Sequence, residues 1–409
     1  MAENITFSGQ NLRTFEKALK ENYLPAWRNQ LGIEPSALLG KIKKPKLTSN
    51  KIVATAPIGL SGGFGYGAEG QATPAAGGVR VERFETTAKD MYVNVVISEK
   101  AVKLTGSSGA MANALDTEVK GAYATAKWNV GRSLFGNGTG ILTTTKEVTE
   151  AGNTIEVDDV SYLKEGLIID IYKATLDGDG KVVEGTESLA ENGRRLLSIN
   201  RANKTITIDG DATTFEAGFI TVQNSYNREI TGLGAIFDDS ITSLYGVSKE
   251  LNPFLKPVVQ DCGDDISDGI ITKALRQAKN DKNSNIDMIL CGDDAYDHYV
   301  EYLRVNNIRV EELSHTIQGG FKAIKFIFGN KEIDIVNESF VPSTEMWGVE
   351  TGCLELHSLD WNFAELQNGG IFNLMEKQSC YRALLANYGD LICTNPGGCI
   401  RLTNVGYTA

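Results

Sequence analysis

The sequence predicts an α+β protein that carries an all-β insertion, and three features indicate this fold class. Apolar residues recur at helical spacing, without a proline, from 110 to 135. About eighty residues, 146–230, hold only short runs of β-forming residues separated by turn sequences. The segment after them alternates helix-like and strand-like patterns. In a chain of 409 residues this organisation predicts more than one compact region.

The N-terminal part predicts an amphipathic helix followed by a basic connector. In residues 11–31, one helical face carries Leu12, Phe15, Leu19 and Tyr23, and Pro25 ends or bends this helix. The connector is rich in lysine, at Lys41, Lys43, Lys44, Lys46 and Lys51. A solvated linker is the favoured interpretation of this run, and contact with a polyanion is the alternative.

The next element is a glycine-rich arm. Segments 51–57 and 79–84 have the composition of strands, and they flank GLSGGFGYGAEGQATPAAGG at 59–78. Glycine loses the most entropy on ordering and offers no side chain to bury, so this tip gains little from its own domain. Phe64 and Tyr66 have no core of their own to enter, and we expect both rings to be buried against another subunit.

The remaining elements follow in order. A strand is expected at 91–97, a short helical turn at 99–104, and the long helix at 110–135, which stops at a glycine-rich turn. The 146–230 region is expected to form a β-barrel or a β-sandwich. Helices are then predicted at 268–280 and 293–305, with Asp293 and Asp294 as N-terminal caps, around a buried strand at 286–292. Further strands are expected at 321–328, 333–336, 346–349, 353–359, 371–375 and 382–392.

Composition excludes several classes of protein. No apolar run reaches the length of about 20 residues that a membrane span needs, and MAENITFSGQ lacks the pattern of a signal peptide. We therefore expect synthesis in the cytoplasm and no membrane partner. A net charge of −12 argues against a protein that grips nucleic acid with its whole surface. Six cysteines without a CxxC pair, and three histidines, predict reduced thiols and no zinc site.

Motifs with a known chemistry are weak. Gly65, Gly67 and Gly70 form a GxGxxG, but no helix follows, so a nucleotide site is not expected. DGDG at 177–180 is better explained as a hairpin turn than as a calcium loop, because Ser188 stands where that loop needs glutamate. The acidic run 261–268 is typical of a solvated turn at a helix start. No catalytic, cofactor-binding or metal-binding residues are expected, and the protein is not expected to be an enzyme.

The order of these parts resembles the major capsid protein of tailed bacteriophages, the Hong Kong phage shell fold that encapsulins share. The motifs that carry the resemblance are GAEGQATPAAGG in the tip, VVISEKAV after it, and FGNGTGI with the later ITGLGAIFDD. The resemblance implies the following parts: an N-terminal arm (1–50), an E-loop (51–90), a peripheral domain (91–145) with its spine helix (110–135), a β insertion domain (146–230), an axial domain (231–345), and a return to axial and peripheral strands (346–409).

The resemblance also implies a function. The chain would be a head protein that assembles as pentamers and hexamers into an icosahedral shell around double-stranded DNA, without sequence-specific binding. A scaffolding protein and a portal would be partners, assembly would occur in the host cytoplasm, and the virion would be the final location. An encapsulin-like shell that loads cargo is the alternative, and a β-rich carbohydrate-binding protein is a weaker one.

Two further expectations concern assembly chemistry. Residues 59–78 contain no lysine, so covalent crosslinking through the E-loop is not expected. About fifty residues precede the E-loop, so no cleaved scaffolding segment is expected either. The residues expected at subunit contacts, at and beside the tip, are Phe64, Tyr66, Glu69, Arg80 and Arg83.

Overall fold

The computed structural model describes most of the chain, and the described residues fall into two compact units. They are 36–57, 62–70, 72–73, 75–98, 108–178, 180–306, 314–316, 322–365, 371–375 and 378–407. The helix expected at 11–31 and the turn expected at 99–104 lie outside them. The first unit comprises Met1–Gly131 and Thr242–Ala409, and the second comprises Arg132–Ile241.

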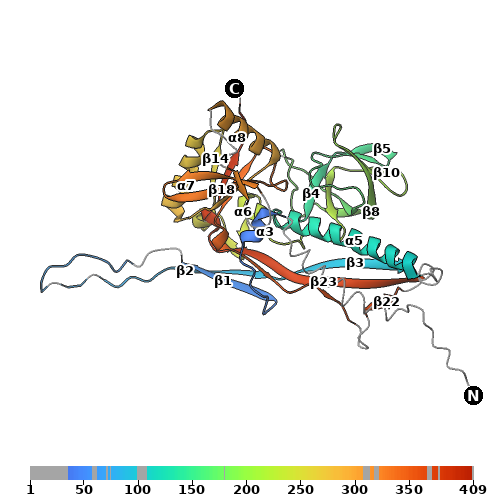
Figure 1. Cartoon of the computed structure of the whole chain (residues 1–409), viewed down its shortest axis with the longest axis horizontal. Coiled ribbons are helices and arrows are strands. Elements are labelled where there is room, and N and C mark those ends of the chain that lie inside the picture. The colour runs from blue at the N-terminus through green and yellow to red at the C-terminus, as the bar shows by residue number, and fades with distance from the viewer. Residues whose placement is uncertain are drawn as a thin grey trace, which may run out of the picture. The chain divides into compact units, whose positions relative to one another are not determined.

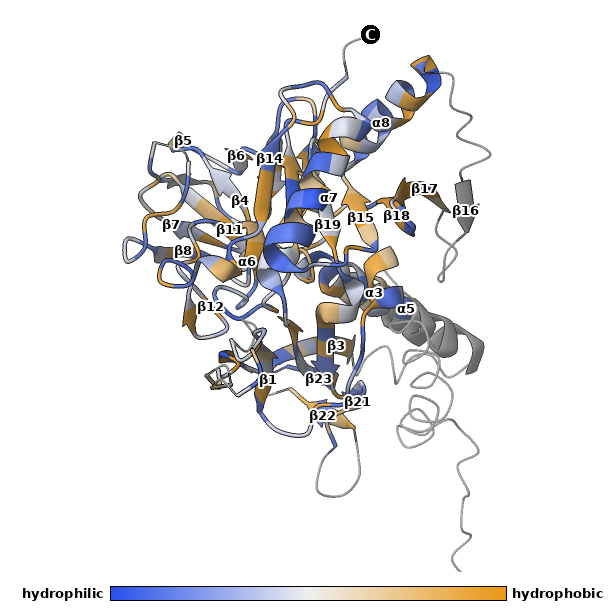
Figure 2. Cartoon of the chain, turned by 90° about the vertical axis from the view of Figure 1, so that its left-hand side faces the viewer, coloured by the Kyte–Doolittle hydropathy of each residue, from blue (hydrophilic) through white to orange (hydrophobic). Residues whose placement is uncertain are grey.

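A seven-stranded mixed sheet forms one part of the first unit. Its strands, in spatial order, are β14 (Val258–Asp261), β24 (Ile400–Thr403), β19 (Met346–Val349), β15 (Met288–Cys291), β18 (Lys331–Asn337), β17 (Lys322–Phe328) and β16 (Ser314–Thr316). Helices α7 (Asp268–Lys282) and α8 (Asp293–Val305) bury Ala274, Leu275 and Tyr299 in one core with the sheet. Figure 2 shows the exposed side of α7 as hydrophilic and the strands behind it as hydrophobic.

α8 has the bounds expected from the sequence, 293–305, but its N-cap residue differs from the expectation. Its N-cap is Gly292, whereas Asp293 and Asp294, predicted as caps, lie in the first helical turn. A Cβ atom on residue 292 would come within 2.1 Å of the Pro342 carbonyl oxygen. Close backbone packing therefore requires glycine at this position, and the two carboxylates instead interact favourably with the helix dipole.

A second sheet is built around β23 (Cys380–Cys393). This strand pairs antiparallel with β3 (Lys89–Ser98) along ten residues, and with three shorter strands, β20 (Leu354–Ser358), β21 (Asn362–Phe363) and β22 (Phe372–Leu374). The long helix α5 (Ser108–Ser133), expected at 110–135, lies along β3 and β23 (Figure 1). Ala126 of α5 packs there against Val95 and Leu385.

The basic connector runs beside this second sheet. After the short helix α3 (Ala37–Lys41), residues 43–47 lie parallel to β20, with the Lys43 N–H donating to the Leu354 carbonyl at 3.2 Å. Three lysines of the run pair with carboxylates of their own chain, Lys41 with Asp334, Lys43 with Glu355 and Lys51 with Glu85. These intrachain pairs favour the linker interpretation over contact with a polyanion.

The second unit is a closed β-barrel. Its six strands, in order, are β4 (Ile141–Thr145), β11 (Gly218–Val222), β7 (Ile168–Lys173), β8 (Ser188–Asn200), β9 (Thr205–Ile208) and β6 (Thr154–Glu156). The ends of the sheet meet, because the Lys146 N–H donates to the Glu156 carbonyl at 3.1 Å and the Asp158 N–H donates to the Thr144 carbonyl at 3.1 Å. Barrel closure leaves no free sheet edge and distinguishes this unit from a sandwich.

Smaller elements complete the two units. In the second unit, β5 (Val148–Gly152) pairs with β10 (Thr213–Phe215), and α6 (Gly234–Phe237) follows the barrel. In the first unit, β12 (Ser243–Leu244) pairs with β13 (Val247–Ser248). Single 3-10 turns are η2 (Pro253–Leu255), η3 (Thr351–Cys353) and η4 (Pro396–Gly398).

Candidate subunit interface

The candidate site is the arm, whose base is a regular β-hairpin. Strands β1 (Lys51–Pro57) and β2 (Val81–Thr87) pair antiparallel over seven residues each, from Lys51 with Thr87 to Pro57 with Val81. The second strand was expected at 79–84, so it begins two residues later and continues three residues further. Figure 1 shows the two legs of the glycine-rich segment running on from this hairpin.

The two faces of the hairpin differ in burial because strand side chains alternate. Ile52, Ala56 and Phe84 share one face and are buried, and the Phe84 ring packs at 6.0 Å from the ring of Tyr245. The opposite face exposes Val53 and Val81. One face of the hairpin is thus part of the body of the first unit, and the other face is left to solvent or to a partner.

Distant residues fix the base of the arm. The Glu85 N–H donates to the Tyr245 carbonyl at 2.9 Å, and the Thr86 hydroxyl donates to the buried carboxylate of Asp390. Tyr245 has a positive φ of 51°, an unusual conformation for a tyrosine, held here by close packing. These contacts set the direction in which the hairpin leaves the body.

Charged side chains lie along the hairpin. Glu85 accepts from Lys51 and from Arg83, the Arg83 pair at 2.6 Å, and the Lys51 hydrogen bond lowers the pKa of the Glu85 carboxyl most. Arg80 donates to Glu82 at 2.7 Å and to the Asn252 side chain at 3.2 Å. The structure therefore places Arg80 and Arg83 in contacts within their own chain, both still more than half exposed.

The two legs of the arm meet again beyond the hairpin. A Cβ atom on Gly77 would lie 2.4 Å from the Gly62 nitrogen, whereas one on Gly78 would have no atom within 4 Å. The legs can approach this closely only because residue 77 has no side chain. Glycine at residue 77 is therefore a packing requirement, whereas a Cβ atom on Gly62, Gly67 or Gly78 would meet no atom within 4 Å.

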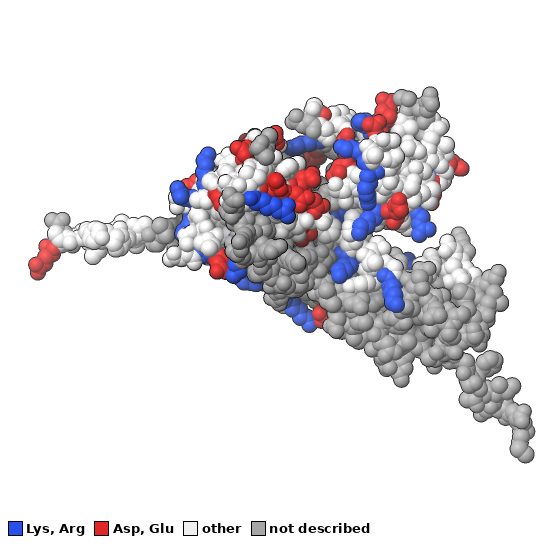
Figure 3. All heavy atoms as spheres, turned by 45° about the horizontal axis from the view of Figure 1, so that its top comes forward, with Lys and Arg blue, Asp and Glu red and all other residues white. Residues whose placement is uncertain are grey.

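The outermost part of the arm presents two aromatic rings to solvent. Phe64 and Tyr66 are 81% and 96% exposed and meet edge to face, with ring centroids 5.5 Å apart. Glu69 is exposed as well, and it is the only charged residue in the sequence 59–78. Figure 3 shows acidic atoms at the far end of the arm. A projecting segment that exposes its largest apolar groups is typical of a surface that docks on another molecule.

Sequence reasoning found the tip but not its anchors. Phe64, Tyr66 and Glu69 stand together at the end of the arm, and Arg80 and Arg83 lie at its base. Tyr245, Asn252 and Asp390 hold the base, although they lie about 160 to 305 residues away along the chain. No local pattern marks them, because their role arises only from the tertiary contacts.

Two of the motifs quoted for the resemblance meet inside the second unit. The Gly234 N–H donates to the Phe135 carbonyl at 3.2 Å, and next to it the Leu233 N–H donates to the Leu134 carbonyl at 2.8 Å. Beside them, Arg132 and Glu229 form a buried ion pair with two hydrogen bonds. FGNGTGI and ITGLGAIFDD are thus the two sides of one packed junction.

The weak chemical motifs are structural where the chain is described. On either side of DGDG, Leu176 and Val182 form an antiparallel bridge, as in a hairpin, and the Asp177 carboxylate accepts from the Lys181 N–H at 2.8 Å. Asp261 accepts from the Gly263 N–H and from Asn404, and the first of these bonds contributes most to lowering the pKa of that carboxyl. Among the described residues, no cluster of histidine, cysteine, aspartate or glutamate could hold a metal ion.

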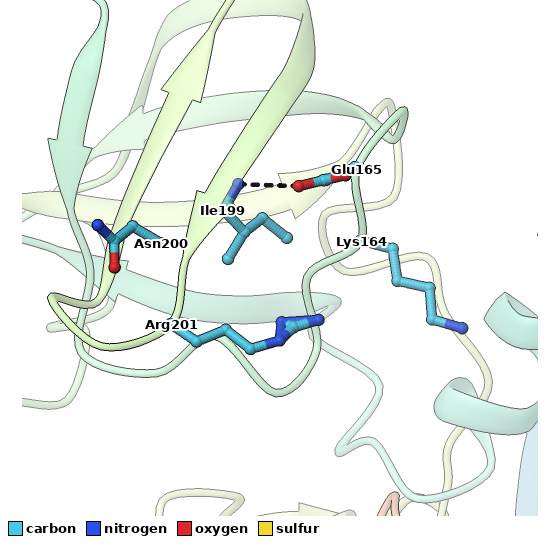
Figure 4. Close-up of a pocket in the computed structure, with 5 residues that line it drawn as sticks. All are labelled: Lys164, Glu165, Ile199, Asn200 and Arg201. Carbon is cyan, nitrogen blue, oxygen red and sulfur yellow. Dashed lines mark hydrogen bonds between the residues drawn. The ribbon is translucent and has the colours of Figure 1, made fainter.

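An open hollow lies at one end of the barrel (Figure 4). It is lined by Lys164, Glu165, Ile199, Asn200 and Arg201. The Glu165 carboxylate accepts from the Ile199 N–H at 3.3 Å, and the Lys164 side chain extends away from it. The hollow is wide open to solvent, and we assign no ligand to it.

In the described part of the chain, no helix has the length and hydropathy that a membrane crossing requires.

Comparison with known proteins identifies the fold. No family model and no curated protein sequence matches the chain. Among solved structures, the capsid asymmetric unit of cyanophage A-1(L) matches with a TM-score of 0.52 and 11% identity, over 91% of this chain and 93% of that one. The capsid of a native GTA particle matches with a TM-score of 0.45, 8% identity and coverage of 92% and 91%. The SrpI encapsulin of Synechococcus elongatus PCC 7942 matches with 0.43, 9% identity and coverage of 90% and 88%.

The cyanophage match carries the conclusion, because it extends over nearly all of both chains. This chain has the α+β fold of a phage capsid subunit. This confirms the prediction from the sequence that the chain has the Hong Kong phage shell fold.

Proposed function

We propose that the chain is the major capsid protein of a tailed bacteriophage, which assembles into an icosahedral shell around double-stranded DNA. One observation carries this function beyond the fold. The arm exposes Phe64 and Tyr66 at its tip, while its base is fixed to the body by Tyr245 and Asp390. A fixed arm with an unpartnered aromatic tip is suited to binding a second copy of the chain.

In this proposal the parts have the roles that the resemblance implies. Residues 1–50 are an N-terminal arm, 51–90 an E-loop, 91–145 a peripheral domain, 146–230 an insertion domain, 231–345 an axial domain, and 346–409 the returning strands. The E-loop of one subunit lies over its neighbour, with Phe64, Tyr66 and Glu69 in the contact. Arg80 and Arg83 lie beside that contact. There, each arginine can exchange its ion pair within the chain for one with a carboxylate of the neighbouring subunit.

The proposal extends to partners and place. Repeated contacts of one kind close into rings of five and six subunits, as an icosahedral shell requires. A scaffolding protein and a portal would act during assembly in the host cytoplasm, and the shell would hold DNA without reading its sequence. The net charge of −12 is compatible with a container that does not bind its contents tightly. The protein acts by assembly and not as an enzyme.

Electron microscopy of the purified protein tests the proposal. We expect pentamers, hexamers or shells, in the presence of the scaffold if not without it. A variant that lacks residues 62–77 should remain a folded subunit that does not assemble. A wild-type protein that stays monomeric under all these conditions would contradict the function, and intact shells from the deletion variant would contradict the role of the arm. Small shells around an enzyme cargo would favour the encapsulin-like alternative.

A further inference from the structure

The sheet built around β23 packs against α5 with one face only. Side chains alternate between the two faces of a strand, and residues paired across an antiparallel sheet point to the same face. Val95, Ala383 and Leu385 lie on the face that packs on Ala126 of α5, and they are buried with it. The residues between them point to the opposite face, which we call the outer face.

The outer face exposes apolar side chains. Its members at the centre of β3 and β23 are Tyr92, Val96, Leu384, Ala386 and Tyr388, with Asn94 among them. Tyr92, Val96 and Tyr388 are 54%, 41% and 37% exposed, and the two tyrosine rings meet edge to face with centroids 6.4 Å apart. An antiparallel sheet with one face in water normally directs polar side chains to that face. An exposed apolar face is instead typical of a contact with another molecule.

Two other exposed apolar side chains on sheets are isolated by charge. Val259 of β14 pairs directly with Arg401, and Ile327 of β17 pairs directly with Glu332. The outer face differs from these positions because its two exposed rings contact each other. It is therefore a continuous surface and not a single exposed side chain.

A charged side chain lies at each end of the outer face. Asp90 pairs with Tyr388 at one end, and Arg382 pairs with Val96 at the other. Both charged residues are exposed. Within the described part of the chain, no residue forms an ion pair or a hydrogen bond with the Arg382 side chain. An exposed cation beside apolar side chains favours a partner that combines apolar groups with a carboxylate.

The tip of the arm carries these complementary groups. Phe64 and Tyr66 are exposed rings in edge-to-face contact, and Glu69 is the only charged residue of 59–78. Aromatic residues that dominate one side of a contact tend to meet such residues of the partner. The tip and the outer face are both exposed in one chain, so the arm does not cover the sheet of its own chain. Two copies are needed to bring them together.

Spacing and charge select one orientation of the tip. Glu69 follows the second ring by three residues, a reach of about 10 Å in an extended chain. Tyr92 and Val96 are four residues apart along β3, about 13 Å. With the rings on Tyr92, the Glu69 carboxylate thus comes within reach of the long Arg382 side chain. The reverse orientation would bring Glu69 to Asp90, and such a contact between like charges is unfavourable.

We propose that the outer face of one subunit is the docking surface for the arm tip of a second copy of the chain. Phe64 and Tyr66 pack on Tyr92 and Tyr388, and Glu69 pairs with Arg382. This inference rests on the function proposed above and names the surface that the arm contacts there.

The N-terminal segment is the competing occupant of the outer face. Residues 11–31 have an apolar helical face in the sequence, but they contain four basic and two acidic residues. The only charge of the tip is a carboxylate, which is the sign that an unpaired Arg382 favours. Charge therefore favours the arm tip over the N-terminal segment.

An exchange of charges tests the pairing. Arg382→Glu and Glu69→Arg should each weaken the contact roughly 10-fold, because each variant places like charges opposite each other. The protein concentration at which shells of the full-length protein appear should rise in both. The double variant Glu69→Arg/Arg382→Glu restores opposite charges, and it should assemble at the wild-type concentration to within about threefold. Arg276→Glu, which changes an exposed arginine of α7, is the matched control and should have no effect.

The outcomes separate this inference from the proposed function. All three substituted positions are exposed, and circular dichroism checks that the variants fold. Single variants that assemble like the wild type, or a double variant that is as impaired as the single ones, would overturn the docking surface and leave the capsid function intact. A wild type that never assembles would contradict the function itself.

Photocrosslinking identifies the occupant of the outer face directly. Benzoylphenylalanine replaces Tyr92, and the assembled full-length protein is irradiated, unfolded and digested with trypsin. The arm tip is released as the peptide 52–80, whereas the N-terminal segment gives the peptides 1–13, 14–17, 18–20 and 21–28. We expect a crosslinked dimer on a denaturing gel and a bond from position 92 to 52–80. A bond from position 92 to an N-terminal peptide or to another part of the chain would overturn the proposal.

Discussion

Truncating the aromatic tip of the arm should prevent assembly without unfolding the subunit. Phe64 and Tyr66 are 81% and 96% exposed, so their removal costs the isolated chain almost no buried surface. Burying about 150 Å² of each ring against a neighbour corresponds to an upper value of about 4 kcal/mol per ring. Ordering of the flexible tip reduces this gain, and about 2 kcal/mol per ring is the typical cost of truncation at a contact centre.

These magnitudes set the size of the expected effect. A loss of about 2 kcal/mol weakens each contact by about 30-fold, and the double variant Phe64→Ala/Tyr66→Ala by about 1000-fold. The assay is the protein concentration at which shells appear, measured by light scattering and sedimentation, with circular dichroism as the test of folding. Ile327→Ala, which removes another exposed apolar side chain, is the matched control. A double variant that assembles at the wild-type concentration would show that the two rings are not buried at a subunit contact.

Three further predictions follow from other contacts. Gly77→Val should impair assembly, because its Cβ atom would collide with Gly62. Gly78→Ala has open space around the new Cβ atom and should assemble normally. If light scattering shows the same assembly for both variants, the two legs of the arm do not approach as closely as described. Glu229→Gln, which removes the carboxylate that pairs with the buried Arg132, should lower the free energy of unfolding by about 3 kcal/mol, and an unchanged urea midpoint argues against this. Burial raises the pKa of Glu338 from 4.5 to about 8. The folded chain therefore keeps a proton that the unfolded chain releases, and the free energy of unfolding should fall as the pH rises from about 4.5 to 8. Glu338→Gln should flatten this dependence on pH.

The fold could be predicted from the sequence where local pattern decides structure. The spacing of apolar residues located α5 to within two residues at each end, because no proline or competing period interrupts it. The short strands between turns predicted the inserted β unit for the same reason. Closure into a barrel depends on hydrogen bonds between Lys146 and Glu156 and between Thr144 and Asp158, and the strand pattern alone does not distinguish it from a sandwich.

The site was predictable in part, and the limit has a physical cause. Glycine content and two aromatic residues without a core marked the tip, since both are properties of the local sequence. The start of α8 was predicted at the correct residue, but its N-cap was assigned wrongly because Gly292 is required by the distant Pro342 carbonyl. The anchors Tyr245 and Asp390 were missed for the same reason, as each acts through a contact that only the folded chain creates.

The packed junction at the ends of the barrel has a consequence for how such a chain is built. Leu134 and Leu233 are hydrogen-bonded neighbours, although ninety-eight residues lie between them. A unit that closes on itself and starts and ends at one place can be gained or lost with little change in the path of the surrounding chain. The same geometry allows residues 137–230 to be removed or replaced as one segment. A shorter linker across Leu134 and Leu233, or a foreign domain with adjacent termini, is a rational substitution at this point.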